Sequence, residues 1–166
     1  KDSRTIDRKT YYDYPRAYKM IDELQPQAVI FSDGGPGCRW VGNEKGFAGA
    51  TNWSFLRAGE VYPGYANYRE LQYGHADGNQ WVAAECDVSI RPGWFYHPEE
   101  DGRVKTVDDL TDLYYRSVGH NATLLLNFPV DRNGLIHPTD SANAVNFYKN
   151  IHKQLANNLL AGLSPK

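Results

Sequence analysis

The chain has 166 residues, enough for one domain with its own hydrophobic core. Its 18 lysines and arginines nearly balance 20 aspartates and glutamates, and no basic block appears, which argues against a nucleic-acid partner. No apolar run approaches the length of a membrane-spanning helix, so we expect no membrane span. Two cysteines, Cys38 and Cys86, are too few for a disulfide scaffold and lack the spacing of metal ligands.

Aromatic residues are abundant, with 12 Tyr, 6 Phe and 4 Trp. An aromatic ring stacks on the apolar face of a pyranose much as it packs on other apolar surface. The composition is therefore compatible with a tyrosine-rich surface or with a sugar-binding site, and it does not decide between the two.

The first predicted element is a helix over residues 13–25, which Asp13 can cap and whose first turn suits Pro15. Residues 28–31 (AVIF) then predict a short, fully buried strand of the kind found in parallel sheets. The following residues, 34–80, show little periodicity. A loop of that length inside a compact domain is usually functional or else wrongly assigned.

Two strands and two helices are predicted further along the chain. Residues 80–90 (QWVAAECDVSI) and 122–127 (ATLLLN) indicate buried strands. One helix begins at Thr106, which forms a capping box with Asp109, and another is expected over residues 139–162. Buried strands that alternate with amphipathic helices predict an α/β fold with right-handed parallel units.

Polar or aromatic residues follow each predicted strand, over residues 33–44, 85–94 and 127–132. In parallel α/β folds the chemistry lies where the strands end. Three strand ends of this character predict one shared site.

Three segments resemble the retaining alpha-L-fucosidases of glycoside hydrolase family 29: LQPQAVIFSDGGPGCRWVGNEKG, WVAAECDVSIRPGWFYHP and GHNATLLLNFPVDRNGLIHPTD. The resemblance extends from about Tyr11 to Gly162. Its Trp-x-Gly-Asn-Glu form is similar to the subfamily that prefers alpha-1,3/1,4-linked fucose. The resemblance implies hydrolysis of terminal fucose from glycans or glycoconjugates, with no metal and no other cofactor.

The family's catalytic domain is a (β/α)8-like barrel of the TIM type, usually followed by a β-sandwich. A complete barrel needs about 250 residues. The resemblance therefore implies that residues 1–166 are the C-terminal half of such a barrel, without its N-terminal half and without the sandwich. We expect the missing half to be the chain's partner and to supply the aspartate nucleophile. Family habits imply a secreted, periplasmic or lysosomal setting.

Glu44, in the loop GCRWVGNEKG, matches the position expected for the acid/base of this subfamily. Retaining glycosidases need two carboxyl groups, one as nucleophile and one as acid and then base. A glutamate beside Trp40 would be partly removed from water, which keeps its proton available for transfer. The alternative is a solvated glutamate that pairs with Lys45 or Arg39.

Four residues are expected to bind the substrate: Trp40, Glu85, Arg91 and Trp94. Trp40 resembles a residue that lines the sugar pocket, with a purely structural tryptophan as the alternative. Glu85 and Asp87 alternate along a strand and share one face, and we expect the pocket face because carboxylates directed into a helix layer are costly. Glu85 is also the second choice for the acid/base. Its alternative role is a buried ion pair with Arg91.

Arg91 and Trp94, in RPGW, resemble a family turn that closes one side of the fucose site. Arginine can donate to a ring oxygen or hydroxyl, and tryptophan can cover the C5 methyl group of fucose. The alternative is an ion-pair or cation–π brace for the turn. Asp33 and Asn127, at strand ends, are expected to support loops more than to contact sugar. The alternative function is carbohydrate binding without catalysis, in a protein that lacks the nucleophile.

Overall fold

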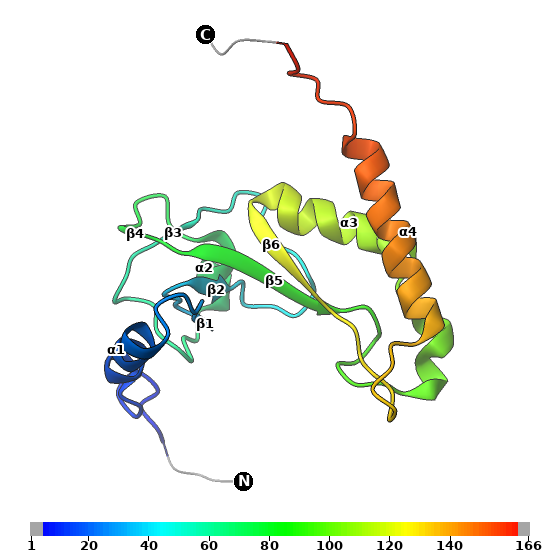
Figure 1. The fold of residues 1–166 in the computed structure, drawn as a ribbon. Coiled ribbons are helices and arrows are strands. Elements are labelled where there is room, and N and C mark those ends of the chain that lie inside the picture. The colour runs from blue at the N-terminus through cyan, green and yellow to red at the C-terminus, as the bar shows by residue number, and fades with distance from the viewer. Residues whose placement is uncertain (1–4, 163–166) are drawn as a thin grey trace. The chain divides into compact units, whose positions relative to one another are not determined.

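The computed structural model describes residues 5–162, which form two compact units. The first unit contains the chain up to Val88 and Tyr115–Leu125, and the second contains Ser89–Tyr114 and the chain from Leu126 onward. The elements follow in this order (Figure 1): α1 (Tyr14–Leu24), β1 (Phe31–Ser32), β2 (Cys38–Trp40), β3 (Phe55–Leu56), α2 (Tyr68–Tyr73), β4 (Gln80–Trp81), β5 (Ala83–Ser89), a 3₁₀ helix (Pro98–Arg103), α3 (Val107–Ser117), a 3₁₀ turn (Val118–His120), β6 (Ala122–Asn127) and α4 (Pro138–Leu155).

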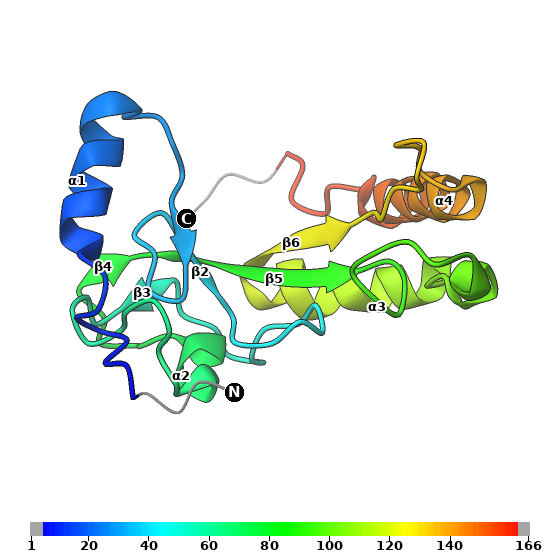
Figure 2. The ribbon, with the colours of Figure 1, turned by 90° about the horizontal axis from the view of Figure 1, so that it is seen from below.

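The central sheet has four strands in the order β1-β2-β5-β6. β1 pairs with β2 in parallel, and β2 pairs with β5 in parallel with Trp40 opposite Glu85. Figure 2 shows β5 and β6 side by side and pointing the same way. β3 and β4 form a separate antiparallel pair. The predicted α/β fold with a parallel sheet is confirmed, whereas a TIM-type barrel half stays a prediction.

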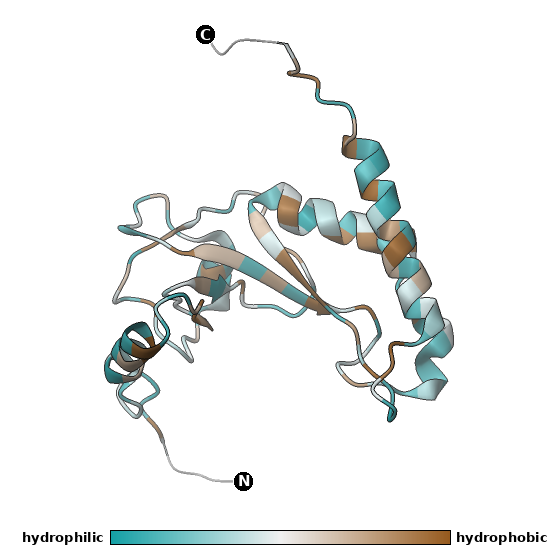
Figure 3. Cartoon of the chain, in the orientation of Figure 1, coloured by the Kyte–Doolittle hydropathy of each residue, from teal (hydrophilic) through white to brown (hydrophobic). Residues whose placement is uncertain are grey.

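One face of the central sheet carries part of the hydrophobic core of the first unit. Along β5, Ala84, Cys86 and Val88 are buried, whereas Glu85 and Asp87 are half-buried. The same alternation of hydrophobic and hydrophilic residues is visible in Figure 3. Because successive side chains of a strand point to opposite faces, the two carboxylates lie on the face away from this core.

Arg39, in the middle of β2, is fully buried on the core side of the sheet. Its guanidinium donates hydrogen bonds of 2.7–3.0 Å to the carbonyl oxygens of Leu71, Val82 and Trp53 and to Oδ1 of Asn52. Burial lowers the pKa of Arg39 to about 10. These bonds tie α2, β4–β5 and the segment before β3 to β2, so Arg39 belongs to the framework and not to a surface pair with Glu44.

Residues 34–80 are not one long loop, because β2, β3 and α2 lie within them, so the second of the two alternatives, a wrong assignment, is correct. The strand predicted over 28–31 is displaced, since only Phe31 of that run belongs to β1. The strand predicted over 80–90 is divided into β4 and β5. The local pattern fails at β2 because its middle residue is a charged arginine, whose burial depends on carbonyl groups from distant parts of the chain.

In the second unit, α3 packs against α4. The rings of Tyr114 and Phe147 meet edge to face with centroids 6.3 Å apart, and Asn150 Nδ2 donates to Thr111 Oγ1 at 2.9 Å. Leu110, Leu113 and Ile151 of the two helices are buried. This packing gives the second unit its own apolar centre.

The helix ends largely follow the sequence signals. In the Thr106 capping box, the Thr106 backbone N–H donates to Asp109 Oδ2 at 2.8 Å and the Asp109 N–H donates to Thr106 Oγ1 at 3.2 Å. Asp13 caps α1 as predicted, accepting from the Arg16 N–H. The last helix differs, because α4 begins at Pro138 after a His137 cap and ends at Leu155, well before residue 162.

The helices of residues 5–162 are all too short or too polar to cross a bilayer. Over the same residues, His, Cys, Asp and Glu side chains form no group of three or more suited to holding a metal ion.

Candidate functional site

β2 and β5 together place Trp40 beside two carboxylates. Trp40 lies opposite Glu85 in the parallel register, and its Nε1 donates to Asp87 Oδ1 at 2.6 Å. The ring of Tyr68, the first residue of α2, packs edge to face on the indole with centroids 5.4 Å apart. The indole is thus fixed from two sides. It lies on the sheet face that carries the half-buried side chains of Glu85 and Asp87, which we call the half-open face.

Glu44 lies in the loop that follows β2, and two glycines shape this loop. Gly42 and Gly46 have φ angles of 78° and 77°, a region that suits glycine. A Cβ atom at Gly42 would lie 2.5 Å from the backbone oxygen of Tyr68, so a larger residue would collide with α2. The loop therefore leaves β2 along a path that only glycine permits.

Asn43 completes the loop through two contacts with the backbone of residues that follow Glu44. Its Nδ2 donates to the Phe47 carbonyl at 3.0 Å, and its Oδ1 accepts from the Lys45 N–H at 3.0 Å. Glu44 itself is exposed. Within residues 5–162, the expectation that Trp40 removes Glu44 from water is therefore not met, and the alternative of a solvated glutamate holds.

Asp87 has the property that the sequence suggested for Glu44, a carboxyl group that is partly removed from water. Burial raises the pKa of Asp87, the Trp40 N–H acts in the opposite direction, and the charge of Glu44 adds to the increase. This effect places Glu44 within electrostatic range of the sheet face. Sequence reasoning recognised Asp87 only as the neighbour of Glu85, although the i, i+2 spacing already put both on one face.

Glu85 is half-buried and contacts Cys38 on the same sheet face. Cys38 Sγ donates to Glu85 Oε2 at 3.8 Å. Burial raises the pKa of Cys38 to about 11, and the charge of Glu85 adds to this, so the thiol stays neutral at pH 7. The alternative of a Glu85–Arg91 ion pair is not supported, because Arg91 is engaged by Asp140 and Asp101.

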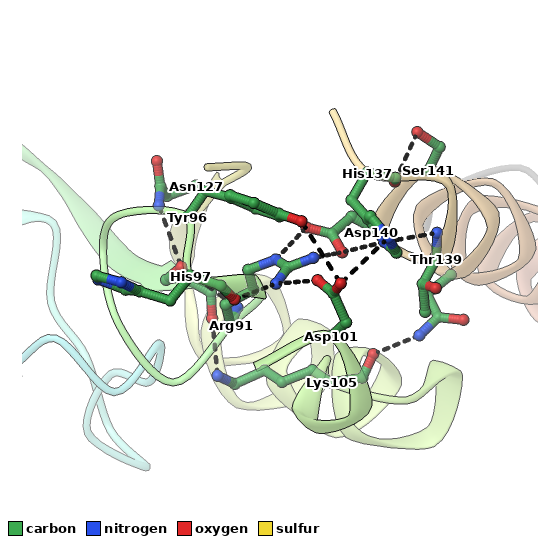
Figure 4. Close-up of polar contacts among 12 residues, drawn as sticks. Arg91, Tyr96, His97, Asp101, Lys105, Asn127, His137, Thr139, Asp140 and Ser141 are labelled. Carbon is green, nitrogen blue, oxygen red and sulfur yellow. Dashed lines mark hydrogen bonds and ion pairs between the residues drawn. The ribbon is translucent and has the colours of Figure 1, made fainter. Parts of the chain in front are cut away.

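Arg91 lies in the second unit and only 1% of its surface is exposed. Its Nε and Nη2 donate to the two carboxylate oxygens of Asp140 at 2.8 and 2.9 Å, and Nη1 donates to Asp101 at 2.9 Å (Figure 4). The guanidinium also lies 4.6 Å from the centre of the Tyr96 ring. These contacts match the alternative of a brace for the turn. Direct donation from Arg91 to a sugar stays a prediction.

Trp94 is half-buried in the same unit, and Asn127 holds its backbone. Asn127 Nδ2 donates to the Trp94 carbonyl and to Ser89 Oγ, both at 3.1 Å. Lys105 Nζ donates to the Ser89 carbonyl at 2.7 Å (Figure 4). Asn127 therefore supports the turn that carries Trp94, as expected, and contact of the indole with sugar stays a prediction.

Comparison with known proteins adds independent information, although no family model matches the chain. Alpha-L-fucosidase 1 of Arabidopsis thaliana is 43% identical over 153 residues. A crystal structure of a glycoside hydrolase 29 family member from an unknown rumen bacterium is 46% identical, with a TM-score of 0.87 over 99% of this chain. A Ruminococcus gnavus GH29 fucosidase solved in complex with fucose is 29% identical, with a TM-score of 0.78 over 98% of this chain.

The chain is similar to alpha-L-fucosidases of glycoside hydrolase family 29. The family resemblance seen in three sequence segments is thereby supported over nearly the whole chain. The chain covers 29% of the length of the Arabidopsis relative, 29% of the rumen bacterial protein and 34% of the Ruminococcus protein. It therefore spans about a third of the length of each of these three proteins.

Two further residues at strand ends support loops, which was expected for Asp33. Asp33 accepts a hydrogen bond from the Gly64 backbone N–H. Asp131 accepts from the backbone N–H groups of Asn133 and Leu135 at 2.8 and 2.9 Å. The candidate residues thus fall into two groups, with Trp40, Glu44, Glu85 and Asp87 in the first unit and Arg91 and Trp94 in the second.

Proposed function

We propose that this protein is a retaining exo-alpha-L-fucosidase in which Glu44 is the acid/base. The observation that carries the proposal is the placement of Glu44 on a glycine-shaped loop at the end of β2. There its charge acts on Asp87, which shares a sheet face with Trp40 and Glu85. The similarity to alpha-L-fucosidases over 89% of the chain supports the same reaction.

The reaction would proceed by double displacement. An aspartate from outside the described residues attacks the anomeric carbon while Glu44 gives its proton to the departing glycosidic oxygen. Glu44 then takes a proton from water, which attacks the anomeric carbon and releases fucose. Two inversions give net retention of configuration. Glu85, whose carboxylate faces the same side of the sheet, is the second candidate for the acid/base.

The finer parts of the proposal concern substrate and fold. The Trp-x-Gly-Asn-Glu form supports a preference for alpha-1,3/1,4-linked fucose on branched glycans. Leu125 on β6 is 49% exposed and Phe31 on the edge strand β1 is 47% exposed. Such uncovered apolar side chains support the proposal that further strands complete a (β/α)8-like barrel around this sheet. Family resemblance alone supports a secreted, periplasmic or lysosomal location.

The test is hydrolysis of fucosylated oligosaccharides and of an aryl alpha-L-fucoside, with the first-formed anomer followed by NMR. We expect alpha-L-fucose as the first product. Glu44→Gln should lower kcat/KM for oligosaccharides by about 10²–10⁴-fold, the usual contribution of general acid/base catalysis. The matched control is Glu23→Gln, a change at an exposed glutamate on α1.

Three other outcomes would each change a different part of the proposed function. A large loss in Glu85→Gln with little effect of Glu44→Gln would transfer the acid/base role to Glu85. A protein that binds fucosides and hydrolyses none of them would have the alternative function, carbohydrate binding without catalysis. A preference for alpha-1,2-linked over alpha-1,3/1,4-linked substrates would contradict only the subfamily assignment.

A further inference from the structure

Glu70 lies in α2 and accepts hydrogen bonds from four side chains, although the proposed reaction gives it no role. Its Oε2 accepts from the Tyr65 hydroxyl and, at 3.2 Å, from Asn67 Nδ2. Its Oε1 accepts from His75 Nε2 at 2.6 Å and from Arg57 Nη2 at 3.3 Å. We call these five residues the Glu70 cluster. Both carboxylate oxygens are engaged, by donors from the segments before and after α2.

The protonation states in the Glu70 cluster suit these bonds. Nδ1 of the buried His75 accepts from the Arg57 backbone N–H at 3.1 Å, so the ring hydrogen lies on Nε2 and is donated to Glu70. The hydrogen bond to Glu70 is the main cause that raises the pKa of Tyr65 to about 12, so the hydroxyl keeps its proton at pH 7. The same bond lowers the pKa of Glu70. Hydrogen bonds to a charged acceptor are the stronger kind, and here they fix the position of α2.

α2 contacts the start of the loop 41–49, which carries Glu44. The ring of Tyr68 packs against Trp40, the last residue before the loop, with centroids 5.4 Å apart. The backbone of Tyr68 leaves no room for a side chain at Gly42. The path by which the chain leaves β2 is therefore set by the first residue of α2.

The far end of the same loop packs against the last residues of α2. The Gly49 N–H donates to the Gln72 carbonyl at 3.1 Å, and a Cβ atom at Gly49 would lie 2.5 Å from the Tyr73 ring. Further on, the Trp53 N–H donates to the Tyr73 carbonyl at 2.8 Å. A displacement of α2 would therefore move both ends of the loop, and Glu44 lies between them. All of these residues belong to the first unit.

We propose that Glu70 is a positioning residue, which fixes α2 and thereby holds the loop 41–49 so that Glu44 can reach the departing oxygen. The inference rests on the proposed function, in which Glu44 is the acid/base. A general acid has to lie within hydrogen-bond reach of the group that it protonates. A displacement of about 1 Å caused far from the chemistry can cost about 10²-fold in rate. Glu70 acts through α2 and makes no contact with the substrate.

The test compares kcat/KM for two aryl fucosides that differ in how much their leaving groups need an acid. 2,4-Dinitrophenolate leaves without a proton, whereas 4-methoxyphenolate needs one. Glu70→Gln keeps the size of the side chain but replaces one accepting oxygen with a donor. It should lower kcat/KM for the 4-methoxyphenyl fucoside about 10–100-fold. The value for the 2,4-dinitrophenyl fucoside should stay within about twofold, because that step needs no acid.

A purely structural role for Glu70 gives a different result. A smaller fraction of folded protein would lower kcat/KM by the same factor for both fucosides. Equal losses on the two substrates, or no loss on either, would therefore overturn the inference.

Two further variants support the comparison. Tyr65→Phe removes one donor to Glu70 and keeps the partly buried ring, so it should give the same substrate dependence with a smaller loss. Glu60→Gln is the matched control, because the exposed Glu60 also pairs with Arg57, at 3.4 Å, but lies outside α2 and the loop 41–49. It should behave as wild type on both substrates. The same substrate dependence in Glu60→Gln would contradict a specific role of Glu70.

Hydrogen exchange separates this inference from the proposed function. The Gly49 amide, which is bonded to α2, should exchange at least about tenfold faster in Glu70→Gln than in wild type. The Val41 amide, which donates to the Glu85 carbonyl at 3.2 Å, should exchange as in wild type. If the protein hydrolyses neither fucoside, the proposed function fails, but this measurement still decides whether Glu70 fixes the loop. Unchanged exchange at Gly49, or an equal increase at Val41, would overturn the inference.

Discussion

The two units use the same chemical group, a side-chain carboxylate, in opposite ways. In the second unit, Asp140 is fully buried and both of its oxygens accept hydrogen bonds from Arg91. In the first unit, Glu85 and Asp87 are half-buried on a sheet face and Glu44 is exposed. A carboxylate that is buried and fully paired has a structural role. One on a half-open face keeps oxygen atoms that a ligand or a proton can reach.

The largest stability effect should follow from breaking the buried pair. Arg91→Met leaves Asp140 buried without its partner, so we expect a loss of about 3–5 kcal/mol in the free energy of unfolding. Urea unfolding followed by fluorescence measures this loss. Lys19→Met is the control, because the Lys19–Glu23 pair is 3.8 Å long, is 77% and 62% exposed and should contribute less than about 0.5 kcal/mol. A loss at Arg91 as small as the control would contradict the structural role of this pair.

A smaller effect is expected on the half-open face. Trp40→Phe keeps the ring against Tyr68 and removes the indole N–H that donates to Asp87. Leaving a half-buried acceptor without its donor should cost about 1–2 kcal/mol at neutral pH. Trp81→Phe, at a largely exposed indole in β4, is the matched control. Equal losses in the two variants would mean that the Trp40–Asp87 bond contributes nothing specific.

The smallest effect concerns pH. Burial raises the pKa of Asp87, so the folded state favours the protonated acid more than the unfolded state does. This contribution to stability is complete below the ordinary aspartate pKa of about 3.9 and is lost as the pH rises through the higher folded value. Asp87→Asn removes the titration, so its stability relative to wild type should increase with pH across that window.

Melting temperatures of wild type and Asp87→Asn from about pH 3.5 to 7 measure this difference, a window that starts below the reference aspartate value. Asp22→Asn, at an exposed position on α1, is the control. A stability of Asp87→Asn relative to wild type that falls as the pH rises would contradict the sign of the effect.

The sequence predicted those elements whose signals are local. The Thr106–Asp109 capping box and the Asp13 cap lie within three residues of their partners, and both helices begin where expected. β2 was missed because Arg39 interrupts its apolar run, and the carbonyls that make its burial possible lie up to 43 residues away. Arg91 and Asp140 are 49 residues apart, so no local pattern reveals that they pair.

The same distinction applies to the candidate site. The resemblance to fucosidases made Trp40 and Glu44 candidates, and the alternation along β5 put Glu85 and Asp87 on one face. The exposure of Glu44 was predicted only as the alternative, because it depends on the turn that Gly42 and Asn43 make after β2. Spacing reports which side chains share a face, but the path of a loop depends on tertiary contacts such as the one between Gly42 and α2.

The most direct test of the central claim is azide rescue of Glu44→Gln with 2,4-dinitrophenyl alpha-L-fucoside. This leaving group needs no acid, so the intermediate should accumulate when Glu44 cannot activate water. Azide, which needs no base, should then accelerate turnover and give alpha-L-fucosyl azide. Rescue that gives beta-L-fucosyl azide would identify Glu44 as the nucleophile. No acceleration by azide, with turnover equal to wild type, would show that Glu44 is not the acid/base.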